Sequence, residues 1–231
     1  MLGSLGASYA HEVNSLNVAP PITSKIRLDQ KLGQQIPLDL TFKNEKGEVV
    51  ELNQFFGRRP VVLALVYYEC PSLCTMVLNG LFRSLGDVKL ERGEEFSVVV
   101  VSIDPKETPE LAAKKKEKYG TTYLHSSHEK GIHFLTGQEG NIQKLAASIG
   151  FGYAYDPKLK MYAHPGMVTL LTPYGKVSSY LLGVDFPERD LRLGLVEASD
   201  SKIGTAVDHF LLYCYKYDPL AGKYGLVLPL S

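Results

Sequence analysis

Pro60-Val61-Val62-Leu63-Ala64-Leu65-Val66-Tyr67-Tyr68-Glu69-Cys70-Pro71-Ser72-Leu73-Cys74 is the stretch that decides the fold. It begins with a continuous apolar run in which β-branched and aromatic residues recur, and such a run predicts a central strand buried on both faces. From Cys74 onward, Val77, Leu81 and Leu85 follow at helical spacing and predict an amphipathic helix that ends near Gly86. The segment therefore predicts a strand, a turn that carries two cysteines, and a helix.

The order of strand and helix repeats downstream. Phe96-Ser97-Val98-Val99-Val100-Val101-Ser102-Ile103 predicts a second buried strand, and Thr108-Pro109-Glu110 begins a helix with a capping residue and an early proline. We expect this helix to run to Gly120. The next segment is predicted to be a polar loop with three solvated histidines, followed by Phe134-Leu135-Thr136; these histidines are His125, His128 and His133.

Two antiparallel hairpins and two further helices complete the pattern. Alternation and turn residues predict the hairpins, and the helices are bounded by proline or glycine. The hairpins cover 36–52 and 167–182, and the helices cover 141–149 and 187–198. This order predicts an α/β fold of three layers, in which a central mixed sheet with parallel strands in its middle is covered by helices on both faces.

The composition limits the classes of function. The 231 residues include 25 Lys and Arg against 25 Asp and Glu, and 45% of them are hydrophobic, which is typical of a folded globular chain. A net charge of zero argues against a nucleic-acid partner, because phosphate neutralisation requires a basic excess. No signal peptide and no apolar stretch long enough to span a bilayer is visible.

We expect an irregular N-terminal arm over 1–30, a main domain over 31–205 and a C-terminal extension over 206–231.

Three cysteines are too few for a disulfide framework, and two of them, Cys70 and Cys74, lie four residues apart. They follow a buried strand at its carboxyl end, where open α/β sheets place ligand sites, and their spacing lets both sulfurs reach one metal ion or each other. The helix N-terminus is expected to lower their thiol pKa values. Two thiolates favour Cu(I), and one added imidazole gives a site that suits copper better than structural zinc. The alternatives are a structural disulfide or two core thiols.

His164 is the best candidate for the third ligand among the six histidines, because it directly precedes the predicted strand that begins at Met167. It reaches the cysteines if that strand lies beside the cysteine-bearing strand. His209 is expected to be a packed or hydrogen-bonded core residue, and His11 lies in the arm.

Three segments together resemble the SCO/SenC family over about residues 33–200. They are Val61–Cys74, the run Ser102-Ile103-Asp104-Pro105-Lys106-Glu107-Thr108-Pro109-Glu110, and His164 ahead of Val168–Lys176. The resemblance implies a thioredoxin-like fold that binds copper, Cu(I) or Cu(II), through Cys70, Cys74 and His164. It also implies a metallochaperone for the binuclear copper centre of cytochrome c oxidase, whose copper-bearing subunit would be the partner, in an extracytoplasmic compartment such as the periplasm.

The chain departs from the family pattern beside the proposed ligands. Thr75 stands where members usually have a proline, and Ala163 and Pro165 replace the usual neighbours of the histidine. A different class of function also stays open. In this alternative the protein is a thiol–disulfide oxidoreductase, and Cys70 and Cys74 are its redox pair. Three residues separate the two cysteines, whereas the spacing typical of such enzymes is Cys-x-x-Cys. A structural protein–protein module is the third class.

The last part of the chain carries the third cysteine. Cys214 lies in the aromatic run Phe210–Tyr217 and is expected to be a lone buried thiol. This tail resembles that of a family subgroup in which a carboxyl-terminal membrane anchor follows the copper-binding domain, and the apolar end Leu226–Leu230 fits such an anchor.

Overall fold

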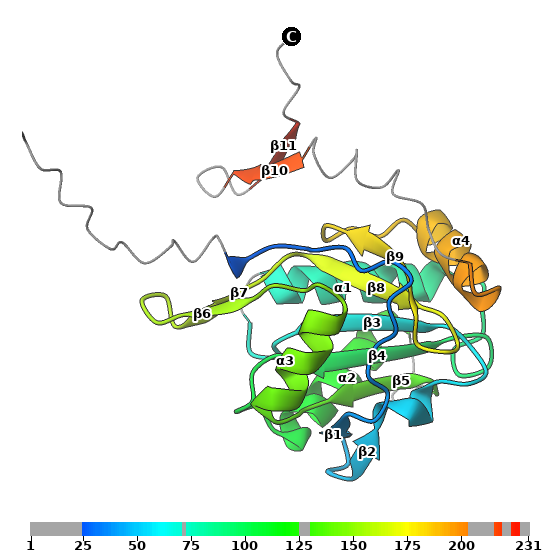
Figure 1. The fold of residues 1–231 in the computed structure, drawn as a ribbon, viewed down its shortest axis with the longest axis horizontal. Coiled ribbons are helices and arrows are strands. Elements are labelled where there is room, and N and C mark those ends of the chain that lie inside the picture. The colour runs from blue at the N-terminus through cyan, green and yellow to red at the C-terminus, as the bar shows by residue number, and fades with distance from the viewer. Residues whose placement is uncertain (1–24, 71–72, 125–129, 203–214, 219–222, 227–231) are drawn as a thin grey trace, which may run out of the picture.

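A computed structural model describes residues 25–70, 73–124, 130–202, 215–218 and 223–226 (Figure 1). The strands are β1 (Thr41–Lys43), β2 (Val49–Glu51), β3 (Val61–Val66), β4 (Ser97–Ser102), β5 (Ile132–Leu135), β6 (Ala154–Asp156), β7 (Met161–Ala163), β8 (Met167–Leu171), β9 (Val177–Leu182), β10 (Tyr215–Asp218) and β11 (Lys223–Leu226). The helices are the short 3-10 helix η2 (Leu52–Phe55) and α1 (Leu73–Asp87), α2 (Pro109–Tyr123), α3 (Glu139–Ser148) and α4 (Glu188–Ser199).

A five-stranded mixed sheet in the order β5-β4-β3-β8-β9 forms the centre of the molecule. Strands β3, β4 and β5 run parallel, whereas β8 pairs antiparallel with both β3 and β9. Every residue of β3 and of β4 is buried, as the continuous apolar runs predict. The predicted core strands and the hairpin of β8 and β9 are confirmed.

Helices cover both faces of this sheet. Helix α1 contacts α2 and α4 and lies in one layer with them, whereas α3 lies in front of the sheet in Figure 1. Helix α2 begins as predicted, because the Thr108 side chain accepts a hydrogen bond from the N–H of Leu111 and Pro109 occupies the first turn. The three-layer α/β fold is confirmed, and it is thioredoxin-like.

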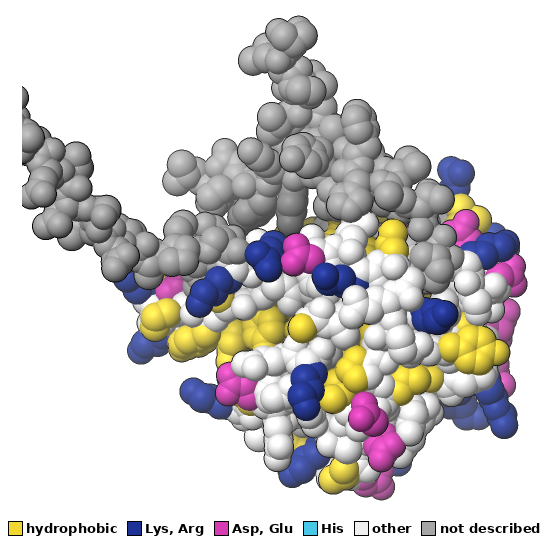
Figure 2. All heavy atoms as spheres, in the orientation of Figure 1, with side chains coloured by type: hydrophobic (Ala, Val, Ile, Leu, Met, Phe, Trp, Pro, Cys, Tyr) yellow, Lys and Arg dark blue, Asp and Glu magenta, His cyan; other side chains and the backbone are white. Residues whose placement is uncertain are grey.

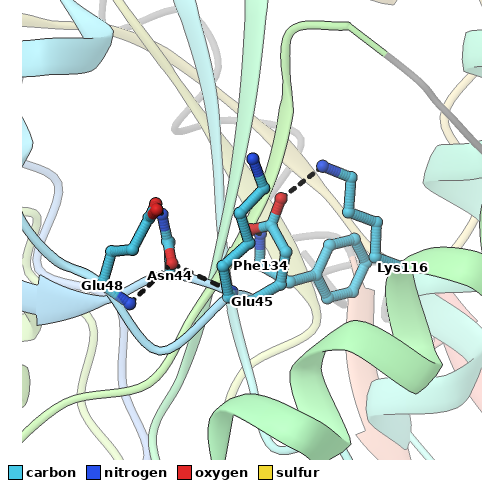
Figure 3. A network of polar contacts seen from close by, with 6 residues as sticks. Asn44, Glu45, Glu48, Lys116 and Phe134 are labelled. Carbon is cyan, nitrogen blue, oxygen red and sulfur yellow. Dashed lines mark hydrogen bonds and ion pairs between the residues drawn. The ribbon is translucent and has the colours of Figure 1, made fainter.

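The N-terminal hairpin is anchored to the domain through its turn. Strands β1 and β2 pair antiparallel, and Glu45 in the turn between them forms an ion pair with Lys116 of α2 (Figure 3). Its carboxylate also accepts a hydrogen bond from the N–H of Phe134 in β5. Both charged side chains are mostly buried, so the hairpin is held against the sheet by a partly desolvated ion pair.

The prediction of a solvated His133 is wrong. His133 is the second residue of β5, and its ring packs against Phe55 of η2 with centroids 4.5 Å apart. Burial lowers the pKa of His133 to about 4, with the nearby Glu45 carboxylate opposing this shift. One polar residue in a strand of four residues gives only a weak local signal, and Phe55 of η2, which packs against it, lies far away in the sequence. His125 and His128 lie outside the described residues.

The structure adds a short hairpin, β6 and β7, that the sequence analysis did not predict; its two strands have only three residues each. The domain boundaries at 30 and 205 stay predictions, because 1–24 and 203–214 lie outside the described residues, as do His11, His209 and Cys214. In the C-terminal extension, β10 and β11 pair antiparallel. No helix in the described ranges has the length and hydropathy needed to cross a membrane.

Candidate metal and thiol site

The antiparallel pairing of β8 with β3 brings His164 to the cysteines. Val61 at the start of β3 pairs with Leu171 at the end of β8, so the start of β8 lies near the carboxyl end of β3. His164 comes just before β8, and Cys70 comes just after β3. Two segments that are 90 residues apart in the sequence therefore meet at one edge of the sheet, as the sequence analysis required.

Cys74 and His164 are in direct contact. The sulfur of Cys74 lies 2.6 Å from Nε2 of His164, and both residues are buried. The other ring nitrogen, Nδ1, lies 2.9 Å from the carbonyl oxygen of Pro165. A carbonyl only accepts, so Nδ1 donates and Nε2 presents its lone pair to the sulfur. Pro165, a departure from the family pattern, thus supplies the main-chain group that orients the imidazole.

Cys70 joins this pair through its sulfur, which accepts a hydrogen bond from the N–H of Cys74 over 3.4 Å. Tyr67 donates its N–H to the sulfur of Cys74, over 3.5 Å. Both cysteines are free thiols, so the alternative of a structural disulfide is not what the structure contains.

The expected lowering of the thiol pKa by the helix is wrong for Cys74. Burial raises the pKa of the Cys74 thiol well above its ordinary value, and the hydrogen bond that it shares with Cys70 adds to the rise. The Cys74 side chain is 1% exposed, so desolvation of a thiolate outweighs the favourable end of a helix dipole. Burial also lowers the pKa of His164, which keeps its imidazole in the neutral form that binds metals.

The donor set fits a soft metal ion, but the Cys74 sulfur and His164 Nε2 lie too close together to leave room for one. Within the described ranges, no three His, Cys, Asp or Glu side chains stand in an arrangement ready for a metal ion. Bonds of about 2.3 Å to sulfur and about 2.0 Å to nitrogen, as in zinc sites, place the two ligand atoms about 3.5 Å apart at a tetrahedral angle. The sulfur of Cys74 and Nε2 of His164 therefore have to separate by about 1 Å to admit an ion of this size.

Aromatic side chains of the β6–β7 hairpin and its neighbours cover the site. The ring of Tyr67 meets the ring of His164 and that of Tyr162 edge-on, with centroids 6.4 Å and 5.5 Å apart. Tyr162 in turn contacts Tyr155, which is 48% exposed. Figure 2 shows hydrophobic side chains gathered over this hairpin. A continuous aromatic layer thus leads from the buried imidazole to the surface.

Glu107 supports the turn that carries the cysteines, and the sequence analysis did not assign it a role. Its carboxylate accepts hydrogen bonds from the N–H groups of Tyr68 and Glu69, each over 2.8 Å, and from the hydroxyl of Ser102. Burial raises the pKa of Glu107, and these hydrogen bonds oppose the rise. The local signal in the sequence is that Glu107 is an acidic residue between a predicted strand end and a predicted helix start.

Solved structures share this fold. ScoI from Arabidopsis thaliana with copper bound is 19% identical, with a TM-score of 0.55, and the match covers 70% of this chain and 96% of that one. A SCO1/SenC family lipoprotein from Bacillus anthracis is 17% identical, with a TM-score of 0.61 over 75% of this chain and 99% of that one. At these identities the likeness shows the fold alone.

Sequence comparison adds a curated relative and a family. A Stutzerimonas stutzeri protein named "Putative copper-binding protein" is 24% identical over 124 residues, which are 52% of this chain. The chain spans only 56% of that relative's length. The SCO1/SenC family model matches residues 29–191, a range that includes both cysteines of the turn, Glu107 and His164. Since that match covers most of the chain and the whole central sheet, the chain belongs to the SCO1/SenC family.

Proposed function

We propose that this protein is a copper metallochaperone that binds copper through Cys70, Cys74 and His164. The observation that carries the proposal is the contact of 2.6 Å between the Cys74 sulfur and the lone pair of His164 Nε2, with the Cys70 sulfur hydrogen-bonded to the N–H of Cys74. Two sulfurs and one neutral imidazole form a soft, three-donor set, which suits Cu(I) and lacks the fourth ligand of a structural zinc site.

Family membership and relatives described as binding copper support the cargo. The proposed recipient is the copper-bearing subunit of cytochrome c oxidase, or another protein with thiolate copper ligands, and copper would pass by exchange of one thiolate for another. The proposed place is extracytoplasmic, and the lipoprotein among the structural neighbours supports it.

Burial explains how the cargo would be protected. The side chains of Cys70, Cys74 and His164 are 6%, 1% and 5% exposed. Such a site shields Cu(I) from water and oxygen, and it allows transfer only when the aromatic cover moves. Charge does not steer the partner over a long range, because the chain has no net charge.

The test is an anaerobic titration of the reduced protein with Cu(I) in competition with a chromogenic chelator. We expect stoichiometric binding that falls by orders of magnitude in Cys70→Ser and Cys74→Ser. We expect it to fall by at least about 10- to 100-fold in His164→Ala, because losing a ligand costs no less than losing a group that supports one. His133→Gln is the matched histidine control, and Cys214→Ser is the matched cysteine control. Binding that His164→Ala leaves unchanged, or that Cys214→Ser abolishes, contradicts this ligand set.

A second candidate is thiol–disulfide exchange, and the asymmetry of the two sulfurs favours it. The Cys70 sulfur accepts a hydrogen bond from the N–H of Cys74, which stabilises a thiolate, whereas burial keeps Cys74 protonated. Cys70 would attack a partner disulfide and release one partner thiol. Cys74 would then give up its proton, attack the mixed disulfide and release the second thiol, so that the partner gains two electrons and a Cys70–Cys74 disulfide forms.

Trapping distinguishes this candidate from the chaperone. In metal-free Cys74→Ser protein incubated with a model disulfide, the oxidoreductase would accumulate a mixed disulfide on Cys70, detected by mass spectrometry. The matched Cys70→Ser variant would accumulate much less adduct on Cys74. Equal trapping on the two cysteines, or none, removes the support for this activity.

A further inference from the structure

We infer that Thr75 is a positioning residue whose hydroxyl holds the main chain of Cys70 against the first turn of α1 and thereby sets the separation of the two cysteine sulfurs. The inference rests on the proposed function, because its first readout is copper binding. It concerns a side chain that is not itself a ligand and that departs from the family pattern.

Cys70 is tied to α1 at two points. The hydroxyl of Thr75 donates to the carbonyl oxygen of Cys70 over 2.6 Å, and the N–H of Cys74 donates to the Cys70 sulfur over 3.4 Å. Cys74 and Thr75 are the second and third residues of α1. Consecutive residues of the first helical turn therefore hold both the carbonyl and the sulfur of Cys70, and these two bonds close the loop between the cysteines.

Cys70 depends on such contacts more than the other two proposed ligands do. Cys74 lies inside α1 and is 1% exposed, and a backbone carbonyl orients the ring of His164. Cys70 follows β3 and precedes α1, so regular secondary structure does not fix its main chain. The bond from Thr75 is short and partly buried, which makes it a contact that can fix Cys70 instead.

The bond requires a hydroxyl at position 75, which proline, the usual family residue there, lacks. Threonine side chains commonly bond to a nearby backbone carbonyl. Here the carbonyl belongs to a proposed metal ligand and lies outside the helix. The hydroxyl therefore links the helix to the ligand, whereas a proline would only stiffen the first turn.

Both reactions open to the cysteine pair need the sulfurs at a defined separation. Two bonds of about 2.3 Å to one metal ion place the sulfurs about 4 Å apart, and a disulfide places them about 2 Å apart. In either case only some positions of the Cys70 main chain let its sulfur join that of Cys74. Without the Thr75 bond, the metal-free chain also occupies other positions, and the apparent affinity falls with the population of the competent one.

The variant that tests this inference is Thr75→Val, which removes the hydroxyl and keeps the β-branched shape. We expect the Cu(I) affinity of the reduced protein, measured by chelator competition, to fall about 2- to 10-fold, the range that one ordinary hydrogen bond allows. Thr75→Ser keeps the hydroxyl and is expected to restore the affinity. Thr121→Val is the matched control, because the Thr121 hydroxyl also donates to a backbone carbonyl, that of Glu117 in α2, over 2.8 Å.

A second measurement needs no metal. The reduced protein is equilibrated with glutathione disulfide, which gains two electrons and two protons and leaves as two glutathione thiols while Cys70 and Cys74 form a disulfide. We expect the equilibrium constant of this exchange to fall about 2- to 10-fold in Thr75→Val and to recover in Thr75→Ser. Urea unfolding is the stability control, since Thr75→Val and Thr121→Val each lose one hydrogen bond and only the first is expected to change the chemistry of the cysteines.

The outcomes separate the two proposals. If the unaltered chain binds no copper, the proposed function fails, and the glutathione equilibrium alone decides the role of Thr75. If that chain forms no Cys70–Cys74 disulfide either, there is no pair to position and the role of Thr75 is overturned as well.

If the unaltered chain binds copper while Thr75→Val matches it in both measurements, only the role of Thr75 is overturned. A fall in either measurement that Thr75→Ser reverses supports the role. An equal fall in Thr75→Ser or in Thr121→Val overturns it, since the hydroxyl beside Cys70 is then not the cause.

Discussion

His133 makes the stability of this protein dependent on pH, and a single substitution isolates its contribution. The perturbation is His133→Phe, which keeps an aromatic ring against Phe55 but cannot be protonated. Burial lowers the pKa of His133 from 6.5 to about 4 in the folded protein. The His133 ring is therefore protonated near pH 6.5 in the unfolded chain but only near pH 4 in the folded protein.

The sign and size of the effect follow from this difference. A histidine with a depressed pKa in the folded state contributes its full stability above its unfolded pKa and loses it as the pH falls toward the folded pKa. With the values of 6.5 and about 4, the free energy of unfolding falls by about 2 kcal/mol between about pH 7 and about pH 5. His164 has a lowered pKa as well and adds to the total loss in the same direction.

The assay is urea unfolding of both chains at the two pH values, in the presence of a metal chelator. The variant's loss in free energy of unfolding between the two pH values is subtracted from that of the unaltered chain. This subtraction cancels the contributions of His164 and of all the carboxylates, and we expect the remaining difference to be about 2 kcal/mol. An NMR titration of the His133 ring is the independent check. A difference below about 0.5 kcal/mol, or a ring that titrates near its ordinary pKa, refutes the reasoning.

Three further predictions concern contacts that support the site or the fold. Glu107→Gln loses a charged acceptor of two backbone N–H groups, and we expect urea unfolding to show a loss of about 1–3 kcal/mol and weaker Cu(I) binding; unchanged values in both contradict the supporting role. Glu45→Gln leaves a mostly buried lysine on α2 without its ion pair and is expected to cost about 1–3 kcal/mol near neutral pH. Because the pKa of Glu45 is lowered in the folded protein, this cost shrinks as the pH falls below about 4.5, and a cost that is independent of pH argues against the ion pair. Gly80→Ala in α1 places a Cβ 1.9 Å from the carbonyl oxygen of Val184 and is expected to lower the melting temperature, whereas Gly140→Ala in α3 meets nothing within 4 Å and is expected to leave it unchanged or raise it; equal effects of the two substitutions would refute the contact.

The main helices and the buried strands were predictable because their signals are local. An uninterrupted apolar run such as Val61–Val66 has to be buried on both faces, and Thr108-Pro109 marks a helix start whatever surrounds it. The weakest local signals gave the errors. The hairpin β6–β7 has strands of three residues, and His133 is one polar residue in a strand of four.

The sequence by itself determined the α/β order, the pair of cysteines after the first core strand and the choice of His164 as their partner. Only the tertiary structure decided how these groups act together, because their contacts depend on strand pairing and burial. The antiparallel β8 sets the 2.6 Å contact between Cys74 and His164, and desolvation reverses the expected pKa shift of Cys74.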